Sequence, residues 1–208
     1  MEEFSPLLII LIVIFLLALI VSTTKSRNVE STQKPNPKQH IKHLEKNVST
    51  QNRLDIHDHP EVKVQRVIDG DTVIVIYNRQ KVKIRLDAID CPEDGQEWGD
   101  IATYGLIKLI GGKTIRMEIH TADIYNRTVA TLYVQQKYEA DWINVNEKMV
   151  TLGHAWVMRR YYQHLPKERQ NRLNDLERWA KSKKIGLWKT HSPTPPWQWR
   201  NNVNKAKI

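Results

Sequence analysis

Cysteine is nearly absent from this chain, with Cys91 the single one among 208 residues. A lone cysteine cannot form a disulfide within the chain, and it cannot build a cysteine-based zinc cage. The eight histidines are scattered, and the His-Glu-x-x-His spacing of zinc hydrolases does not occur. These absences argue against a zinc hydrolase and leave the redox compartment undetermined.

Acidic residues are outnumbered by basic ones. Lys and Arg total 32 against 23 Asp and Glu, which gives a net charge of +9 and a pI of about 9.6. Such a charge favours an anionic partner, and nucleic acid and an acidic membrane surface both qualify. Six carboxylates nevertheless fall close together: Asp69, Asp71, Asp87, Asp90, Glu93 and Asp94. An island of negative charge in a positive field would attract a cation.

The long hydrophobic run of the chain lies at its N-terminus, from Leu7 to Val21. At ~1.5 Å per residue it spans only ~22 Å of a ~30 Å hydrocarbon core, so a spanning helix needs flanking residues. The residues before it are acidic, and "VSTTKS" after it lacks an Ala-x-Ala exit. We expect residues 1–24 to be an uncleaved single-pass anchor, with a cleaved signal peptide and a buried helix as alternatives. Lys25 and Arg27 favour a cytoplasmic domain, but one short anchor does not decide the side of the membrane.

Three further regions follow from composition. Residues 25–60 are polar and almost without aromatic clusters, so they predict a flexible tether that buries too little apolar surface to fold. Residues 61–190 carry the patterns of a folded domain. Residues 191–208 are a basic tail rich in Trp and Pro. Packing of this tail on the domain is favoured over contact with a partner.

The folded region opens with a predicted strand, turn and strand over residues 62–77, with the turn at an Asp-Gly pair. Both faces of the second strand are apolar, which is typical of a central strand. A third strand, 81–86, alternates with a period of two. This alternation turns Ile84 and Leu86 toward the core and Arg85 away from it.

Residues 97–112 then predict a helix that ends at a Gly-Gly pair. Two more strands are predicted at 113–121 and 127–135. In the first of them we expect three alternating residues to face the core: Ile115, Met117 and Ile119.

Two helices are expected to close the folded region. The first covers 141–156, and the second covers 166–188, opening at a Pro and closing at Gly186. Four residues of the first are expected to face inward: Val145, Met149, Val150 and Leu152. Five short strands, a helix before the fourth and two helices at the end indicate an α+β domain. A five-stranded OB-fold barrel with three helices is the natural candidate.

Two carboxylates are expected to converge in this fold. Asp71 follows the tight turn, and Asp90 follows the strand that carries Arg85. If the two strands are antiparallel neighbours, these positions lie at the same edge of the sheet. Hard cations such as Ca²⁺ bind carboxylate, carbonyl and water oxygens, and they need neither His nor thiolate. The alternative is that these carboxylates belong to turns and simply face water.

Three segments, in this order and spacing, resemble the signature segments of the staphylococcal nuclease family: "VIDGDTVIV", "KIRLDAIDCPE" and "DIYNR". The resemblance covers about residues 62–188, and "GLW" and "PPWQWR" look like endings common in bacterial members. It implies a Ca²⁺-dependent phosphodiesterase on an OB-fold.

Matched position by position, the resemblance implies that Asp71 and Asp90 bind Ca²⁺ through their carboxylates. Cys91 stands where the best-known members usually have Thr, and it would contribute its backbone carbonyl oxygen. A carbonyl does not depend on the side chain, so Cys should be tolerated there as a small buried residue. Glu93 matches the carboxylate that positions or deprotonates the attacking water.

The resemblance also implies which residues bind the phosphate and the nucleoside of the substrate. Arg85 and Arg127 match the two arginines that hold the scissile phosphate, a task that suits the planar guanidinium fork better than Lys. Tyr125 matches a tyrosine that lines the nucleotide pocket. Asn126 stands where Gly is commoner, and Asn tolerates left-handed backbone.

The sequence therefore predicts a membrane-tethered, Ca²⁺-dependent nuclease that cleaves DNA or RNA with little sequence preference and leaves 3′-phosphate ends. The first alternative is a non-catalytic nucleic-acid-binding module on the same fold. The second is an anchored adaptor whose basic surface binds lipid or protein. No obligate protein partner is indicated.

Overall fold

The computed structural model describes residues 56–136 and 141–205, all of which fall in one unit of the chain. The predicted anchor, residues 1–24, and the predicted tether as far as residue 55 lie outside the described residues. Within the described part, no helix is both long enough and apolar enough to cross a membrane.

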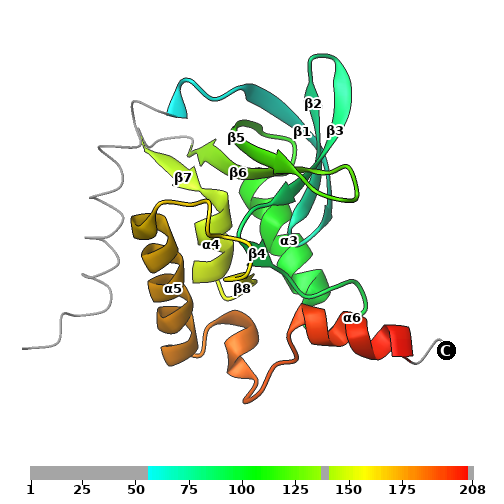
Figure 1. The fold of residues 1–208 in the computed structure, drawn as a ribbon, viewed down its shortest axis with the longest axis vertical. Helices are drawn as coiled ribbons and strands as arrows, with labels where there is room; N and C mark the ends of the chain where they lie inside the picture. Colours follow the sequence, from blue (N-terminus) through cyan, green and yellow to red (C-terminus); the bar gives the residue numbers. More distant parts are fainter. Residues whose placement is uncertain (1–55, 137–140, 206–208) are drawn as a thin grey trace, which may run out of the picture. The chain divides into compact units, whose positions relative to one another are not determined.

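A closed barrel forms the centre of this part of the chain (Figure 1). Its five strands are β1 (Glu61–Asp69), β2 (Thr72–Tyr77), β3 (Gln80–Leu86), β5 (Thr114–Ala122) and β6 (Thr128–Gln135). They pair antiparallel in the order β3-β2-β1-β5-β6, and β3 closes the barrel by pairing parallel with β6. This closure confirms the predicted α+β fold with a five-stranded barrel of the OB type. It also places β2 between two neighbours, as its two apolar faces indicate.

The alternation of apolar residues decides which side chains fill the barrel. Ile84 and Leu86 of β3 are buried, while Lys81 and Lys83, on the other face of the strand, are exposed. The prediction for β5 is only partly right, because Ile119 is 48% exposed. The register of β5 against β6 shifts between Ile119 and Thr121, and a bulge of this kind breaks the period of two.

The predicted helix at 141–156 is wrong in its extent. The chain forms β7 (Trp142–Asn144), then α4 (Val145–Thr151), then β8 (Trp156–Val157). The side chain of Asn144 accepts a hydrogen bond from the backbone of Glu147 and caps α4 at its start. β7 extends the barrel sheet beside β6, and β8 pairs with the short strand β4 (Ile89–Asp90).

The other two predicted helices are present. α3 (Gly99–Ile110) ends at Gly111, and α5 (Lys167–Ser182) begins after Pro166. α5 ends before Gly186, which instead begins the short 3₁₀ helix η1 (Gly186–Lys189). Gly186 has φ +62°, and a side chain there would collide with the backbone of Gly153. The chain must therefore turn at Gly186 to pack against the loop after α4.

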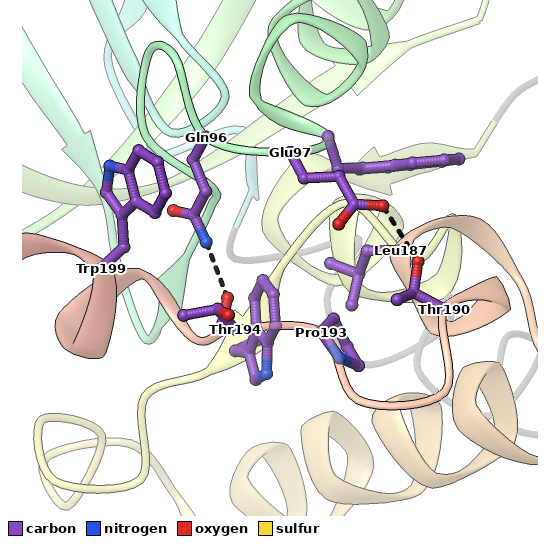
Figure 2. Close-up of a pocket in the computed structure, with 9 residues that line it drawn as sticks. Gln96, Glu97, Leu187, Thr190, Pro193, Thr194 and Trp199 are labelled. Atoms are coloured by element: carbon purple, nitrogen blue, oxygen red, sulfur yellow. Dashed lines mark hydrogen bonds between the residues drawn. The ribbon is translucent and has the colours of Figure 1, made fainter. Parts of the chain in front are cut away.

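The C-terminal tail packs on the domain. It forms α6 (Pro196–Lys205), which Figure 1 shows below the loop that leads into α3. Gln96 Nε2 in that loop donates to the carbonyl of Thr194 at 2.6 Å, and Trp197 meets Trp156 edge to face. A pocket of about 120 Å³ lies between the loop and the tail, with Gln96 facing Thr194 across it (Figure 2). Of the two alternatives for the tail, packing is the one observed.

The last residues of the predicted tether also contact the domain. Ile56 is buried, and Arg116 Nη1 donates to the carbonyls of His57 and His59 at 2.8 and 2.7 Å. The carbonyl of Pro60 accepts from a backbone amide of β5. The folded part therefore begins a few residues before the predicted boundary at residue 61.

Candidate active site

The turn between β1 and β2 holds the first carboxylate of the site. Asp69 Oδ1 accepts a hydrogen bond from the backbone of Asp71 at 3.0 Å, and Asp71 itself is buried. The turn lies tightly against the segment after β4, because a Cβ on Gly70 would stand 2.7 Å from Cβ of Cys91. Glycine is thus required for this close approach. The result is a carboxylate that faces the end of β4.

Arg85 joins the two predicted metal ligands. Its Nη1 lies 3.1 Å from Asp71 Oδ2, and its Nη2 lies 2.8 Å from Asp90 Oδ1. The register explains this meeting, since Thr72 at the start of β2 pairs with Arg85 at the end of β3. The structure therefore brings Asp71, Arg85 and Asp90 together. Arg85 points away from the apolar core, as predicted, but into this cluster rather than into solvent.

Cys91 supports the cluster through its backbone. Its amide donates to Asp71 Oδ2 at 2.7 Å, and its thiol donates to the carbonyl of Gly70 at 3.1 Å. Burial raises the pKa of the Cys91 thiol well above its usual value, which excludes a thiolate nucleophile at neutral pH. The role predicted for its carbonyl oxygen stays a prediction.

Glu93 lies next to Asp90 in the loop before α3. Its backbone is fixed by Gln96, whose side-chain oxygen accepts from the Glu93 amide at 3.0 Å and whose own amide donates to the Glu93 carbonyl. The carboxylate remains 37% exposed. It is therefore both held in place and open to water.

A second arginine, which the sequence analysis did not assign, reaches the same carboxylates from α6. Arg200 Nη2 lies 2.8 Å from Asp90 Oδ2, and Nη1 bonds to Glu93 Oε1. In the sequence Arg200 is the lone basic residue of "SPTPPWQWR", and this is the only signal for it. Asp90 and Glu93 are separated from it by more than 100 positions, so no spacing pattern relates them.

Arg127 and Tyr125 lie beside the cluster rather than within it. Arg127 Nε and Nη2 each contact Asp123 Oδ2 at 2.8 Å, and the guanidinium carbon lies 5.5 Å from the centre of the Tyr125 ring. Tyr125 is 74% exposed. Val129 pairs with Arg85 across the parallel strands, so Arg127, two positions earlier, falls on the same face as Arg85. Asn126 has φ +57°, the left-handed conformation expected of it.

Burial, with a smaller contribution from repulsion between carboxylates, shifts the pKa values of the acidic groups. Burial and the neighbouring charge of Asp71 raise the pKa of Asp69 to about 6. Burial also raises the pKa of Asp90, although Arg200 and Arg85 act in the opposite direction. Burial alone would lower the pKa of Arg85. The negative charges of Asp71 and Asp90 have the larger combined effect, so the pKa of Arg85 is raised. A divalent cation would relieve this repulsion, and the oxygen donors present suit a hard ion such as Ca²⁺.

Comparison with known proteins shows to which family this chain belongs. Residues 83–190 match the family model described as "Staphylococcal nuclease homologue". The chain belongs to the staphylococcal nuclease family. The matched range includes Arg85, Asp90, Glu93 and Arg127, while Asp71 precedes it.

Members of the staphylococcal nuclease family with similar sequences carry nuclease names. An "uncharacterized endonuclease" of Escherichia coli O157:H7 is 38% identical over 147 residues, which cover 71% of this chain and 86% of the relative. A "micrococcal nuclease" of Shigella flexneri is 33% identical, covering 69% of this chain and 82% of the relative. An "uncharacterized endonuclease" of Haemophilus influenzae is 35% identical, covering 69% of this chain and 76% of the relative.

Proposed function

We propose that the chain is a Ca²⁺-dependent nuclease that hydrolyses phosphodiester bonds of DNA or RNA with little sequence preference and leaves 3′-phosphate ends. The observation that carries this proposal is the meeting of buried Asp71 and Asp90 on the two guanidinium nitrogens of Arg85. Family membership and the names of the relatives support the same activity.

The metal ligands in this proposal are the carboxylates of Asp71 and Asp90 and the carbonyl oxygen of Cys91. All three donors are oxygens, which is the donor set of Ca²⁺. When bound, the ion would act as a Lewis acid toward the phosphate and lower the pKa of a nearby water.

Arg85 would stabilise the charge that builds on the phosphate oxygens during hydrolysis. Its fork is held between two carboxylates, so the group is already oriented before substrate arrives. Arg127 reaches the same face from the neighbouring strand and is oriented by Asp123. Exposed Tyr125, next to this turn, offers an aromatic face to a nucleoside.

Glu93 would accept the proton of the attacking water. The water oxygen then forms a bond to phosphorus, the bond from phosphorus to the 5′ oxygen breaks, and that oxygen takes up a proton. The phosphate stays on the 3′ side. The partial exposure of Glu93 allows water to reach its carboxylate, of which one oxygen, Oε1, contacts Arg200.

Cleavage of DNA and RNA by the purified full chain, with Ca²⁺ and then with an excess of chelator, tests this function. Asp71→Asn should abolish Ca²⁺-dependent cleavage, because Asn keeps an oxygen but loses the charge. Asp94→Asn is the matched control, since Asp94 is exposed in the adjoining loop. Product ends should block polymerase extension until phosphatase removes a 3′-phosphate. Binding of nucleic acid without cleavage would favour a non-catalytic module instead.

The proposal includes anchoring of this nuclease to a membrane through residues 1–24. The hydrophobic run in the sequence supports this part. The full chain should sediment with membranes and resist alkaline extraction, whereas a chain starting at residue 50 should not. Recovery of both in the soluble fraction would remove the anchor from the account.

A further inference from the structure

Three possible metal ligands meet outside the carboxylate and arginine cluster. Asp87 lies between β3 and β4, His120 lies on β5, and His164 lies in the loop before α5. One ligand atom from each falls within 4.8 Å of the other two. The sequence counts Asp87 among its clustered carboxylates but singles out neither histidine, and the proposed hydrolysis uses none of the three residues.

The distances suit a small metal ion. His164 Nε2 lies 3.0 Å from Asp87 Oδ2, and His120 Nε2 lies 3.7 Å from the same oxygen. Zinc bonds to imidazole and carboxylate measure ~2.0–2.1 Å, so ligand atoms on the edges of a tetrahedron stand ~3.3 Å apart. The two observed separations lie on either side of that value, so small rotations of the side chains would complete the geometry.

Two of the three ligands are held in place before any ion arrives. The backbone amide of Asp87 donates to Ala130, and its carbonyl accepts from Asn146 Nδ2 at 2.9 Å. The register shift in β5 leaves His120 without a paired residue on β6, and its side chain is only 10% exposed. Bulges commonly direct a side chain toward a site.

The third ligand provides access. The His164 side chain is 40% exposed, so an ion can enter from solvent on its side. The rings of His164 and His120 lie 4.9 Å apart between centroids and are tilted by 56°. They are therefore not stacked face to face, and both can turn a nitrogen toward Asp87.

The surroundings of His120 favour the neutral imidazole, which is the form that binds metals. Burial lowers the pKa of His120, and Arg169 and His164 act in the same direction, while Asp87 and Glu118 oppose them. The charge of Arg169 is itself balanced, because its Nη1 lies 2.8 Å from Glu118 Oε1. His120 Nε2 also contacts Thr131 Oγ1 at 2.9 Å, a hydrogen bond that metal binding would replace.

We propose that Asp87, His120 and His164 form a second metal site, for a divalent transition metal ion of the Zn²⁺ type. Imidazole nitrogens suit such an ion, whereas the oxygen donors of Asp71 and Asp90 suit Ca²⁺. An ion at this site would tie the segment between Arg85 and Asp90 to β5 and to the loop before α5. It would act as a structural clamp beside the nuclease site.

Titration of the purified full chain with Zn²⁺, in excess Ca²⁺ and after removal of other metals, tests this site. One Zn²⁺ should bind per chain and raise the melting temperature. His164→Gln and His120→Gln should each weaken Zn²⁺ binding by at least ~10-fold, a loss seen even for residues that only support a metal ligand. His191→Gln is the matched control, because His191 is exposed in the tail and contacts none of the three ligands.

The outcomes separate this site from the one proposed for Ca²⁺. Zn²⁺ binding that persists in Asp90→Asn and fails in His164→Gln supports the proposal. Absence of binding, or binding that His164→Gln leaves unchanged, overturns it. His164 is partly exposed, so its variant should fold even if His120→Gln does not. Co²⁺ offers a second measurement, since the visible bands of a tetrahedral site should appear with the parent and be lost in His164→Gln.

Discussion

Two buried carboxylates on one short segment of the chain, Asp87 and Asp90, each belong to a different cluster of side chains. Asp90 is surrounded by Arg85, Arg200 and a second carboxylate, Asp71. Asp87, three positions earlier, faces His120 and His164. Burial does not separate them, because both carboxylates are almost completely buried.

The side chains that surround each carboxylate, rather than the carboxylate itself, therefore decide which cation each cluster can bind. A guanidinium keeps its proton and cannot bind a metal, so the Asp90 cluster offers oxygens alone. An imidazole can lose its proton and offer nitrogen, so the Asp87 cluster suits a softer ion. In the Asp90 cluster a cation must also compete with arginines that already contact the carboxylates.

Substitution of Arg85 should affect cleavage most strongly and leave the Asp87 cluster intact. Arg85→Lys should lower the cleavage rate by ~10²-fold or more, since a point charge replaces a fork that grips the phosphate. Zn²⁺ binding at the Asp87 cluster should be unchanged. Lys81→Arg, an exposed change on the same strand, is the control in the same assays. Parental cleavage by Arg85→Lys would show that the phosphate site is misassigned.

A smaller effect is expected from Arg200. Arg200→Gln removes a cation from Asp90 and Glu93, so Ca²⁺ affinity should rise by ~2- to 5-fold, the range for a partly exposed charge pair. Arg178→Gln serves as the control, because Arg178 is exposed on α5. Calorimetric titration with Ca²⁺ would measure both. An affinity that stays equal or falls would mean that Arg200 does not compete with the metal.

The stability of the folded chain should depend on pH through Asp69, which lies beside Asp71. Its pKa of about 6 in the folded chain exceeds the ordinary 3.8, so the folded chain retains a proton that the unfolded chain has lost. Stability should therefore fall as pH rises from about 4 to 6 in the presence of chelator. Asp69→Asn should remove this loss and be more stable at pH 7 by ~1–3 kcal/mol, because a pKa raised by about two corresponds to at most ~3 kcal/mol. Parallel curves of melting temperature against pH for parent and variant would contradict this.

The smallest expected effect is that of removing the N-terminal region. No residue of either cluster precedes Asp69, so a chain starting at residue 50 should cleave DNA at the parental rate and bind Zn²⁺ equally well. A start at Asp58 is expected to be less stable, because it removes buried Ile56 and the His57 carbonyl that Arg116 contacts. Thermal melting compares the two. A soluble, folded but inactive fragment from residue 50 would give the N-terminal region a role in cleavage.

The barrel can be predicted from the sequence because the third and fourth strands alternate with a period of two, an Asp-Gly pair marks the first turn, and three segments resemble those of a known family. The convergence of Asp71 and Asp90 follows from antiparallel pairing of their strands, whereas the place of Arg85 between them is implied only by the family resemblance. β7 and β8 were missed because two or three residues are too short to show a period. Ile119 was misplaced because a register shift leaves no mark in the sequence.

The contacts made over long distances in the chain could not be predicted. Arg200 joins Asp90 only because α6 folds back under the loop before α3, and Gln96 holds the tail there. The Asp87 cluster draws residues from three separate elements, and no short spacing links them. Such groupings depend on tertiary packing, which a single sequence does not display.

Glu93→Gln is the decisive variant, because it separates catalysis from binding at the site that Asp71, Arg85, Asp90 and Glu93 form. Nucleic-acid binding is measured with a divalent ion that does not support cleavage, and cleavage is then measured with Ca²⁺. Binding should be equal or slightly tighter, because a negative charge is removed, and turnover should be lower by ~10²-fold or more. Cleavage by Glu93→Gln at the parental rate would contradict the account.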